Sequence, residues 1–523
     1  MNTAIVNIQK IILCLLLVAC ALCSCEEKRK NVSVSLDSFS DMTESAYRLD
    51  AEKIYAGIRR QVMADSDRET ADIHARRYYL GGGAMVWMAR DGVSAKADSL
   101  LVYINKVGRI GFSREKFFYS DIVSDLQKVR DADFSADSDG SNGINRVYAR
   151  LEYHLTKAFL RYVEGMRFGF MDPYDTFNRL DVRDSDSVRV SYRALYDVPT
   201  KRPDRQFVDE AFRIMARDGK AVGQYLAESQ PENPLYQTFL KRLAEPLSAT
   251  ERYRVLCNME RSRWRHGDYP QKHSKFVVVN IPSLRLVAAD GQERLVMRIG
   301  LGSLETKTPL LTSRVKRMDF NPQWIIPKSI VKKSVRQHAG NRSYFDSRDY
   351  FIQQRSTGRE VDPAEVSGNM LMSQDYLVIQ RGGEGNALGR IVFRFDNDFS
   401  IFMHDTSNRG VFARGDRSVS HGCIRVEKPY ELAVFMLKDK DERLMEKMKY
   451  SMTVKYGRNR TEEDNQSASI DRSMLLRSQK VEPQVPIFIT YYTIYPDADG
   501  NLSAYDDIYG YDPVIYGKIK KYF

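Results

Sequence analysis

The apolar pattern of the chain changes its period near residue 270, and this change constrains the fold more than any other feature. Between residues 36 and 262, apolar residues recur three to four positions apart, as at Leu151, Leu155 and Phe159. That spacing is typical of one face of an α-helix. Beyond residue 270, short β-branched runs such as residues 276–281 alternate with turn signals, a pattern typical of antiparallel strands. We therefore expect an α+β multidomain chain.

The two patterns predict where the domains begin and end. We expect a helical domain at residues 36–262 and a mainly β domain at residues 270–456. Residues 322–389 separate two groups of strands and are predicted to form an inserted lid, since insertions of this size often cover a site. Residues 457–483 are polar and predict an exposed excursion, and residues 484–515 predict C-terminal strands that complete the β domain.

Residues 1–25 have the pattern of a targeting segment. Lys10 is followed by an apolar run at residues 11–24, which is too short to span a bilayer but suits a signal peptide. The small residue Ser24 before Cys25 resembles a lipoprotein processing site, so we expect Cys25 to be lipidated. Lipidation at Cys20, or secretion without a lipid, are the alternatives. All three readings predict export from the cytoplasm.

Cysteine usage separates one residue from the others. Of six cysteines, four lie in or at the end of the targeting segment, which leaves Cys257 and Cys423 in the globular body. Cys257 follows Val255 and Leu256 and is expected to be a small buried hydrophobic residue. Cys423 lies in a polar, glycine-containing segment near two histidines. This difference favours a reactive thiol at Cys423 over a structural disulfide.

The charge balance narrows the choice of partner. The formal net charge is +11, but 80 basic residues are mixed with 69 acidic ones and no basic tract with interleaved aromatics occurs. Nucleic-acid binding is therefore disfavoured, whereas an anionic polymer or membrane surface fits a basic protein. The glycines at residues 81–83 lack the spacing of a nucleotide-binding loop, so no cofactor is expected.

Two histidines accompany Cys423, as nucleophilic thiol chemistry requires. His404 precedes Cys423 by 19 residues and His421 precedes it by two. A free thiol with a pKa of about 8.5 is only a few per cent thiolate at neutral pH, and an imidazole can take its proton. Gly422 allows the backbone to bend under a substrate. The backbone N–H groups of residues 421–423 are then candidate oxyanion donors.

We expect His404 to be the base, because the glycine between His421 and Cys423 predicts a bend that separates their side chains. His421 and Ser420 are then framework residues. Either Asp405 or a backbone carbonyl could orient the His404 ring. Arg425 could bind a substrate carboxylate through its forked guanidinium, or could form a structural salt bridge.

Two other interpretations of the same residues stay open at this point. His404, His421 and Cys423 could supply three ligands of a zinc centre, although their spacing is unusual and no fourth ligand is evident. Alternatively, the cysteine is inert and the histidines are incidental.

Residues 420–426, with His404 placed 19 residues before Cys423, resemble the signature of the YkuD-type L,D-transpeptidases. Ser407 stands where that family has proline after His-Asp-Thr, and the glycine-rich signature of a small peptidoglycan-binding module is not found. Similarity to the long, YcbB-like branch of the family extends over residues 155–159, 279–282, 321–327, 402–412 and 491–510.

The resemblance implies a helical N-terminal scaffold and a mainly β catalytic domain that forms 3→3 cross-links in peptidoglycan. Cys423 would form a thioester with a tetrapeptide donor, His404 would protonate the departing D-alanine, and a diamino-acid acceptor would complete transfer. Trp324 and Arg425 would contact the substrate. The resemblance further implies no metal or other cofactor, acylation by carbapenems, and a periplasmic location in the cell envelope, with the membrane reached through the N-terminal lipid.

Two other functions compete with this expectation. An L,D-carboxypeptidase or endopeptidase would use the same thioester, with water in place of the acceptor amine. A non-enzymatic envelope scaffold would use the helical half alone to bind a partner or the wall. The sequence does not separate these possibilities, because the acceptor site cannot be identified from it.

Overall fold

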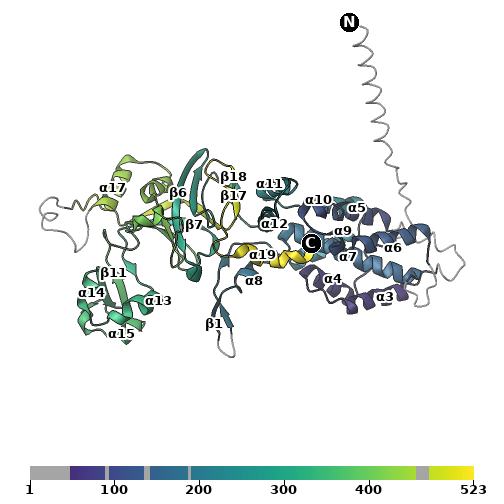
Figure 1. Ribbon diagram of the computed structural model, residues 1–523, viewed down its shortest axis with the longest axis horizontal. Coiled ribbons are helices and arrows are strands. Elements are labelled where there is room, and N and C mark those ends of the chain that lie inside the picture. Colours follow the sequence, from purple (N-terminus) through teal and green to yellow (C-terminus); the bar gives the residue numbers. More distant parts are fainter. Residues whose placement is uncertain (1–47, 89–92, 135–141, 186–189, 455–469) are drawn as a thin grey trace, which may run out of the picture. The chain divides into compact units, whose positions relative to one another are not determined.

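The computed structural model describes residues 48–88, 93–134, 142–185, 190–454 and 470–523 (Figure 1). The predicted targeting segment, with Cys20 and Cys25, lies outside the described residues, as do residues 457–469 of the predicted polar excursion. No helix in the described ranges is both long and apolar enough to cross a membrane.

The described residues form two compact units. The first lies within Met1–Gly108, Phe112–Glu164 and Pro203–Gln230, and the second contains Arg109–Gly111, Gly165–Arg202 and Pro231–Phe523. This division differs from the predicted boundary at residue 262, because the chain leaves the helical unit and returns to it before entering the β domain. Residues 231–262 are helical as predicted, but they pack with the second unit.

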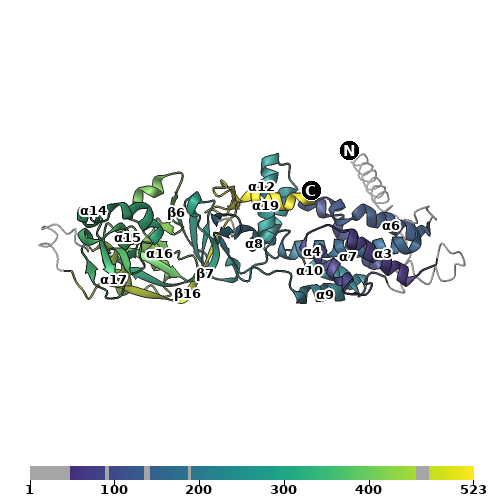
Figure 2. The ribbon, with the colours of Figure 1, turned by 90° about the horizontal axis from the view of Figure 1, so that it is seen from below.

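Helix α7 is the centre of the first unit, and both views show the other helices of this unit around it (Figures 1 and 2). The predicted apolar face of α7 is buried, with Leu155 and Phe159 at 0% exposure. Aspartates cap the surrounding helices: Asp50 accepts from the N–H of Lys53, and Asp204 accepts from that of Phe207. The helices are α3 (Ala51–Ala64), α4 (Thr70–Leu80), α5 (Ser94–Ile104), α6 (Tyr119–Asp131), α7 (Ile144–Phe168), α9 (Arg205–Met215) and α10 (Gly219–Glu228).

The second unit contains further helices around its sheet. Helix α12 begins with a capping box, in which Ser248 and Glu251 each satisfy a backbone N–H of the other. The last helix, α19, begins at Tyr511, inside residues 484–515 that were predicted to form strands. These helices are α8 (Pro173–Phe177), α11 (Pro234–Leu243), α12 (Ala249–Arg263), α16 (Pro429–Met436), α17 (Glu442–Thr453) and α19 (Tyr511–Ile519).

The main sheet closes on itself. Its strands follow the order β12-β13-β15-β6-β5-β4-β16-β7-β3, and β12 also pairs with β7. Strand β16 begins at Ser478, so the predicted excursion to residue 483 was too long at its end. The strands are β3 (Tyr196–Asp197), β4 (Lys275–Asn280), β5 (Arg285–Asp290), β6 (Glu293–Gly302), β7 (Leu310–Phe320), β12 (Ile391–Phe395), β13 (Met403–His404), β15 (Ile424–Val426) and β16 (Ser478–Thr490), with β14 (Ser418–Ser420) paired to β6.

Two short hairpin pairs lie outside this sheet. Strands β1 (Val182–Ser185) and β2 (Val190–Tyr192) pair with each other, and so do β17 (Ile494–Pro496) and β18 (Leu502–Ala504). The predicted C-terminal strands therefore include β16, β17 and β18, and the chain then continues into α19.

The residues between β7 and β12 form a separate small sheet with its own hydrophobic core, which we call the lid (Figure 1). Because Phe320 pairs with Ile391, the lid leaves the main sheet and returns to it at one point. Val331, Phe345 and Leu371 are fully buried in its core. Its elements are β8 (Trp324–Ile325), α13 (Lys328–Ile330), the π-helix Val331–Val335, α14 (Arg342–Asp346), β9 (Tyr350–Gln354), β10 (Glu360–Val361), α15 (Gly368–Met372) and β11 (Tyr376–Gln380).

Candidate active site

Cys423 lies in a sharp loop between β14 and β15, and its side chain is half-buried. Gly422 has a φ of +111°, a backbone conformation that residues with a Cβ rarely adopt. The bend predicted from this glycine is therefore present. It leaves the His421 side chain exposed while Cys423 turns inward.

Ser420 ties this loop together from inside. Its hydroxyl donates to the carbonyl of Cys423 at 2.6 Å and accepts the N–H of Gly422 at 3.1 Å. The N–H of Gly422 is thus occupied, contrary to the expectation that it could serve as an oxyanion donor. The N–H groups of His421 and Cys423 have no hydrogen-bond partner among the described residues.

Two threonines that the sequence did not single out hold the loop from outside. Thr306 Oγ1 donates to the carbonyl of Ser420 at 2.8 Å, and Thr308 Oγ1 donates to that of Gly422 at 2.9 Å. Tyr509 supports Thr308 by accepting its backbone N–H at 3.1 Å. The sequence carries no local signal for these contacts, because they join residues 114 and 201 positions apart.

The strand register brings His404 beside the cysteine loop. Strands β13 and β15 are parallel neighbours, with His404 opposite Arg425. Since alternate residues of an extended chain share a face, Cys423 and Arg425 lie on the face that carries His404. The N–H of Phe402, two residues before His404, lies close enough to the Cys423 sulfur to lower its pKa in part.

The His404 ring is 4% exposed and has a defined orientation. Its Nδ1 contacts the carbonyl oxygen of Asp405 at 2.5 Å, so Nδ1 carries the proton and Nε2 carries the lone pair. The carboxylate of Asp405 instead accepts from the N–H of Arg390 at 2.9 Å and from Arg409 at 3.1 Å. Of the two predicted ways to orient the ring, the backbone carbonyl is the one observed.

Both reactive groups are neutral without substrate. Burial, with a further contribution from the charge of Arg425, lowers the pKa of His404 to about 4. Burial also raises the pKa of Cys423 to about 11, although Arg394 and Arg425 act in the opposite direction. At neutral pH the site therefore holds a thiol and an unprotonated imidazole, rather than a thiolate–imidazolium pair.

Two arginines lie near this neutral pair, and a lysine of the lid lies near His421. The Nε of Arg425 is buried without a hydrogen-bond partner, and Arg425 forms no ion pair with a described carboxylate. Arg394, which the sequence did not single out, donates from Nε to Asp319 at 2.9 Å. Partial desolvation of the exposed His421 ring, and then the charge of Lys333 in the π-helix of the lid, lower the pKa of His421.

Other residues chosen from the sequence lie elsewhere. Trp324 is half-buried on β8 and packs against the hydrophobic core of the lid. Cys257 is fully buried and donates its S–H to the carbonyl of Asp512. Among described residues, no three His, Cys, Asp or Glu side chains are grouped closely enough to hold a metal ion, so the geometry does not support the zinc alternative.

Two family models match the chain, one on each side of the change in apolar period near residue 270. Residues 274–462 match the model of the YkuD L,D-transpeptidase catalytic domain, and residues 74–243 match the model of a scaffold domain. A Haemophilus influenzae protein named "Putative L,D-transpeptidase" is 28% identical over 302 residues, which are 57% of this chain and 57% of that protein. The chain therefore carries a YkuD L,D-transpeptidase catalytic domain together with a scaffold domain, which is the YcbB-like architecture.

Proposed function

We propose that the chain is a peptidoglycan L,D-transpeptidase that forms 3→3 cross-links through a thioester on Cys423. One observation carries this proposal: a buried, oriented imidazole and a half-buried thiol share one face of adjacent strands, next to two unpaired backbone N–H groups. Nucleophile, base and oxyanion donors are the three parts that acyl transfer requires.

In the proposed first step, the sulfur of Cys423 attacks the carbonyl carbon of the third residue of a tetrapeptide stem. The thiol proton passes to His404, and the negative charge on the carbonyl oxygen is stabilised by the N–H groups of His421 and Cys423. Each such donor contributes roughly 2.7–4 kcal/mol to transition-state stabilisation. D-alanine leaves as an amine when His404 returns the proton to its nitrogen.

In the second step, the side-chain amine of a diamino acid in another stem attacks the thioester. His404 takes a proton from this amine and returns it to the Cys423 sulfur as the new amide forms. Because the resting thiol and imidazole are both neutral, the proton must move during attack rather than before it. The site is thus poised for general base catalysis.

The charges around the site support an anionic peptide substrate. Arg425 has an unpaired buried Nε, and Lys333 approaches from the lid. Carboxylates are the stem groups that would pair with them, and an arginine can bind a carboxylate with two hydrogen bonds. We assign Arg425 to substrate binding, with Trp324 contributing through the lid.

The proposed substrate places the protein in the cell envelope, on the periplasmic side. The targeting segment supports export, and Cys25 is the proposed lipidation site. Anchoring by one lipidated cysteine is the proposed route to the membrane. Carbapenems are proposed to acylate Cys423, because their strained amide carbonyl presents the same electrophile as the donor stem.

The decisive experiment compares Cys423→Ala with Cys257→Ala, a matched change at the other described cysteine. Each purified variant is incubated with disaccharide-tetrapeptides, and D-alanine and dimers are measured by mass spectrometry. The wild type and Cys257→Ala should release D-alanine and form dimers, whereas Cys423→Ala should do neither.

D-alanine release by the wild type without dimers would instead support an L,D-carboxypeptidase. Loss of neither product in Cys423→Ala would contradict the thioester, and a wild type that forms neither would support a non-enzymatic scaffold.

A further inference from the structure

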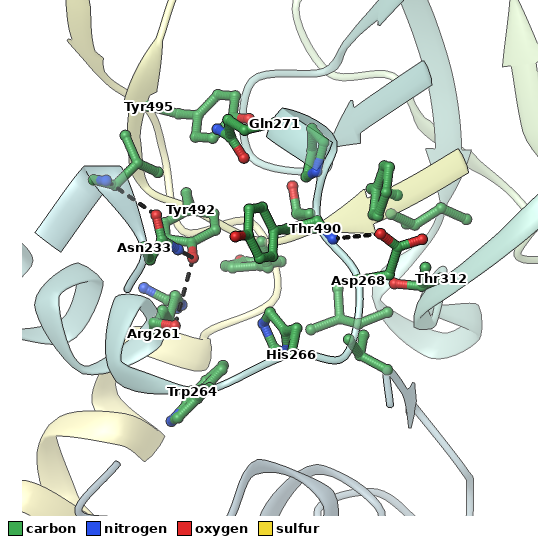
Figure 3. A pocket seen from close by; sticks show the side chains of 18 of the residues that line it. Asn233, Arg261, Trp264, His266, Asp268, Gln271, Thr312, Thr490, Tyr492 and Tyr495 are labelled. Atoms are coloured by element: carbon green, nitrogen blue, oxygen red, sulfur yellow. Dashed lines mark hydrogen bonds between the residues drawn. The ribbon is translucent and has the colours of Figure 1, made fainter. Parts of the chain in front are cut away.

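A pocket outside the proposed active site lies within the second unit, beside the linker that joins α12 to β4 (Figure 3). Its internal space is about 70 Å³, or about 690 Å³ when the open recess at its mouth is included. No residue of the Cys423 loop lines it, so the proposed reaction does not account for it.

Aromatic rings form much of the pocket wall. Trp264 and Tyr269 come from the linker, and Tyr492 and Tyr495 follow β16. The rings of Tyr492 and Tyr495 are 5.5 Å apart, and Trp264 is 5% exposed. Aromatic side chains offer broad apolar faces and, in tyrosine, a polar edge. The wall therefore suits a ligand with a flat apolar face and polar groups around its rim.

His266 supplies a hydrogen-bond acceptor in this wall, and Figure 3 shows its ring pointing toward the middle of the pocket. Thr200 Oγ1 donates its one proton to Val198, so it accepts from both Tyr196 and His266 Nδ1. The proton of His266 is therefore on Nδ1, and Nε2 carries a lone pair with no partner among the described residues. Burial lowers the pKa of His266 to about 4, which keeps this nitrogen unprotonated at neutral pH.

The charged side chains of the wall are already paired. Arg261 donates to Asp512 at 2.5 Å, and Asp268 accepts from His273 at 2.7 Å and from Arg314 at 3.3 Å. A phosphate or carboxylate would find no cation here without a counter-charge, and an ammonium group would find no carboxylate without one. Nη2 of Arg261 and Nε1 of Trp264 are buried without a hydrogen-bond partner among the described residues, so they can donate to a neutral oxygen. The pocket thus favours a neutral ligand.

Additional polar groups face the same space. Thr312 Oγ1 has no hydrogen-bond partner among the described residues, and Thr490 makes only a 3.4 Å contact to Val279. Gln271 places an amide at the exposed end of the linker (Figure 3). Hydroxyl and amide groups can each donate and accept, so they match a ligand with several hydroxyls.

We propose that this pocket binds a neutral sugar ring of a glycan strand. One face of the ring would stack on the tyrosines, and a sugar hydroxyl would donate to Nε2 of His266. The threonine hydroxyls and the Gln271 amide would pair with the remaining polar groups. The choice of a wall glycan as the source rests on the proposed function, whereas the pocket and its chemistry do not.

Sugar binding can be measured without catalysis. The full chain carrying Cys423→Ala, purified in mild detergent, is titrated with a tetramer of N-acetylglucosamine and separately with a tetramer of glucose. Trp264 is one of only three tryptophans, and the other two do not line the pocket. The sugar should change tryptophan fluorescence, and Trp264→Phe should abolish that change. Stronger binding of the N-acetylated tetramer supports a wall glycan, and equal binding supports a general glycan site.

Pocket variants test whether the binding occurs here, with calorimetry as the readout. Tyr495→Ala should weaken binding at least about tenfold, and His266→Phe should weaken it about three- to tenfold through loss of one hydrogen bond. Tyr174→Ala, at an exposed tyrosine outside the pocket, is the matched control and should have no effect. If His266→Phe does not fold, Thr312→Val provides the smaller test.

The results that would refute the sugar site differ from those that would refute the transpeptidase activity. No binding of either tetramer up to about 10 mM, or binding that both Tyr495→Ala and His266→Phe leave unchanged, would overturn the sugar site. Wild-type chain that binds sugar but releases no D-alanine from tetrapeptides would leave the sugar site standing and refute the transpeptidase.

Discussion

In the first unit, buried charges along α7 are paired with one another, whereas around Cys423 in the second unit several polar groups have no partner. Lys157 contacts Asp65 at 2.8 Å, and Arg161 holds Asp72 through two bonds of 2.8 and 3.0 Å. By contrast, the Nε of Arg425 is unpaired. Buried polar groups normally have partners, so unpaired groups indicate positions kept for a ligand.

Buried polar groups therefore have different roles in the two units: stability in the first unit and reaction rate around Cys423. In the first unit, breaking a pair should cost stability, because it leaves a charge buried without a partner. Around Cys423, removing a group should cost rate and leave folding largely unchanged, because that group contributes little to the substrate-free state. Substitutions in the two units can separate these two effects.

His404→Gln should have the largest effect, and it should fall on rate alone. Loss of a general base lowers rates by about 10²- to 10⁴-fold. D-alanine release should fall by this factor, while the melting temperature stays close to that of the wild type. His421→Gln is the control: its proposed contribution is a backbone N–H, which the substitution keeps. A larger loss in His421→Gln than in His404→Gln would reverse the assignment of the base.

Arg161→Leu should lower the free energy of unfolding by about 3–5 kcal/mol, since it removes both hydrogen bonds to the buried Asp72 and leaves that carboxylate only Lys157, at 3.6 Å. The measurement is denaturant unfolding followed by circular dichroism. Arg130→Leu removes a pair with Asp98 in which both side chains are about one-third exposed, and it should cost about 0–1 kcal/mol. Equal losses in the two variants would show that the network along α7 is no more important than a surface pair.

Alkylation of Cys423 should depend on pH in a way that an exposed thiol does not. Only the thiolate reacts, and the Cys423 pKa is about 11, so the rate should rise about a hundredfold from pH 8 to pH 10. The same peptide in denatured chain should gain only about fourfold, because a free thiol with a pKa of about 8.5 is already largely ionised above that pH. Peptide mapping with iodoacetamide separates Cys423 from the other cysteines. A plateau below pH 9 in the folded chain would contradict a neutral resting thiol.

The fold class and the residues of the proposed active site could be predicted because their signals are local or belong to a family signature. Helical and strand periods show in the sequence, and Cys423 stands out through its polar surroundings. The compact units do not follow the predicted boundary at residue 262, because compactness depends on packing between distant segments, here α12 against α19. The occupied N–H of Gly422 was missed for a related reason, since the Ser420 hydroxyl reaches it only once the loop has folded.

Thr308→Val should have the smallest of these effects on rate. No local sequence pattern predicted a role for this residue. The change keeps the shape but removes the hydroxyl that donates to Gly422 and accepts the N–H of Gly302 at 3.0 Å. If Thr308 positions the loop, kcat should fall about tenfold, which is about 1.4 kcal/mol, with KM unchanged. Thr308→Ser should restore most of the rate because it returns the hydroxyl. A Thr308→Val chain with wild-type kcat would show that Ser420 and Thr306 hold the loop without Thr308, whereas equal loss in both variants would show that the methyl group, not the hydrogen bond, matters.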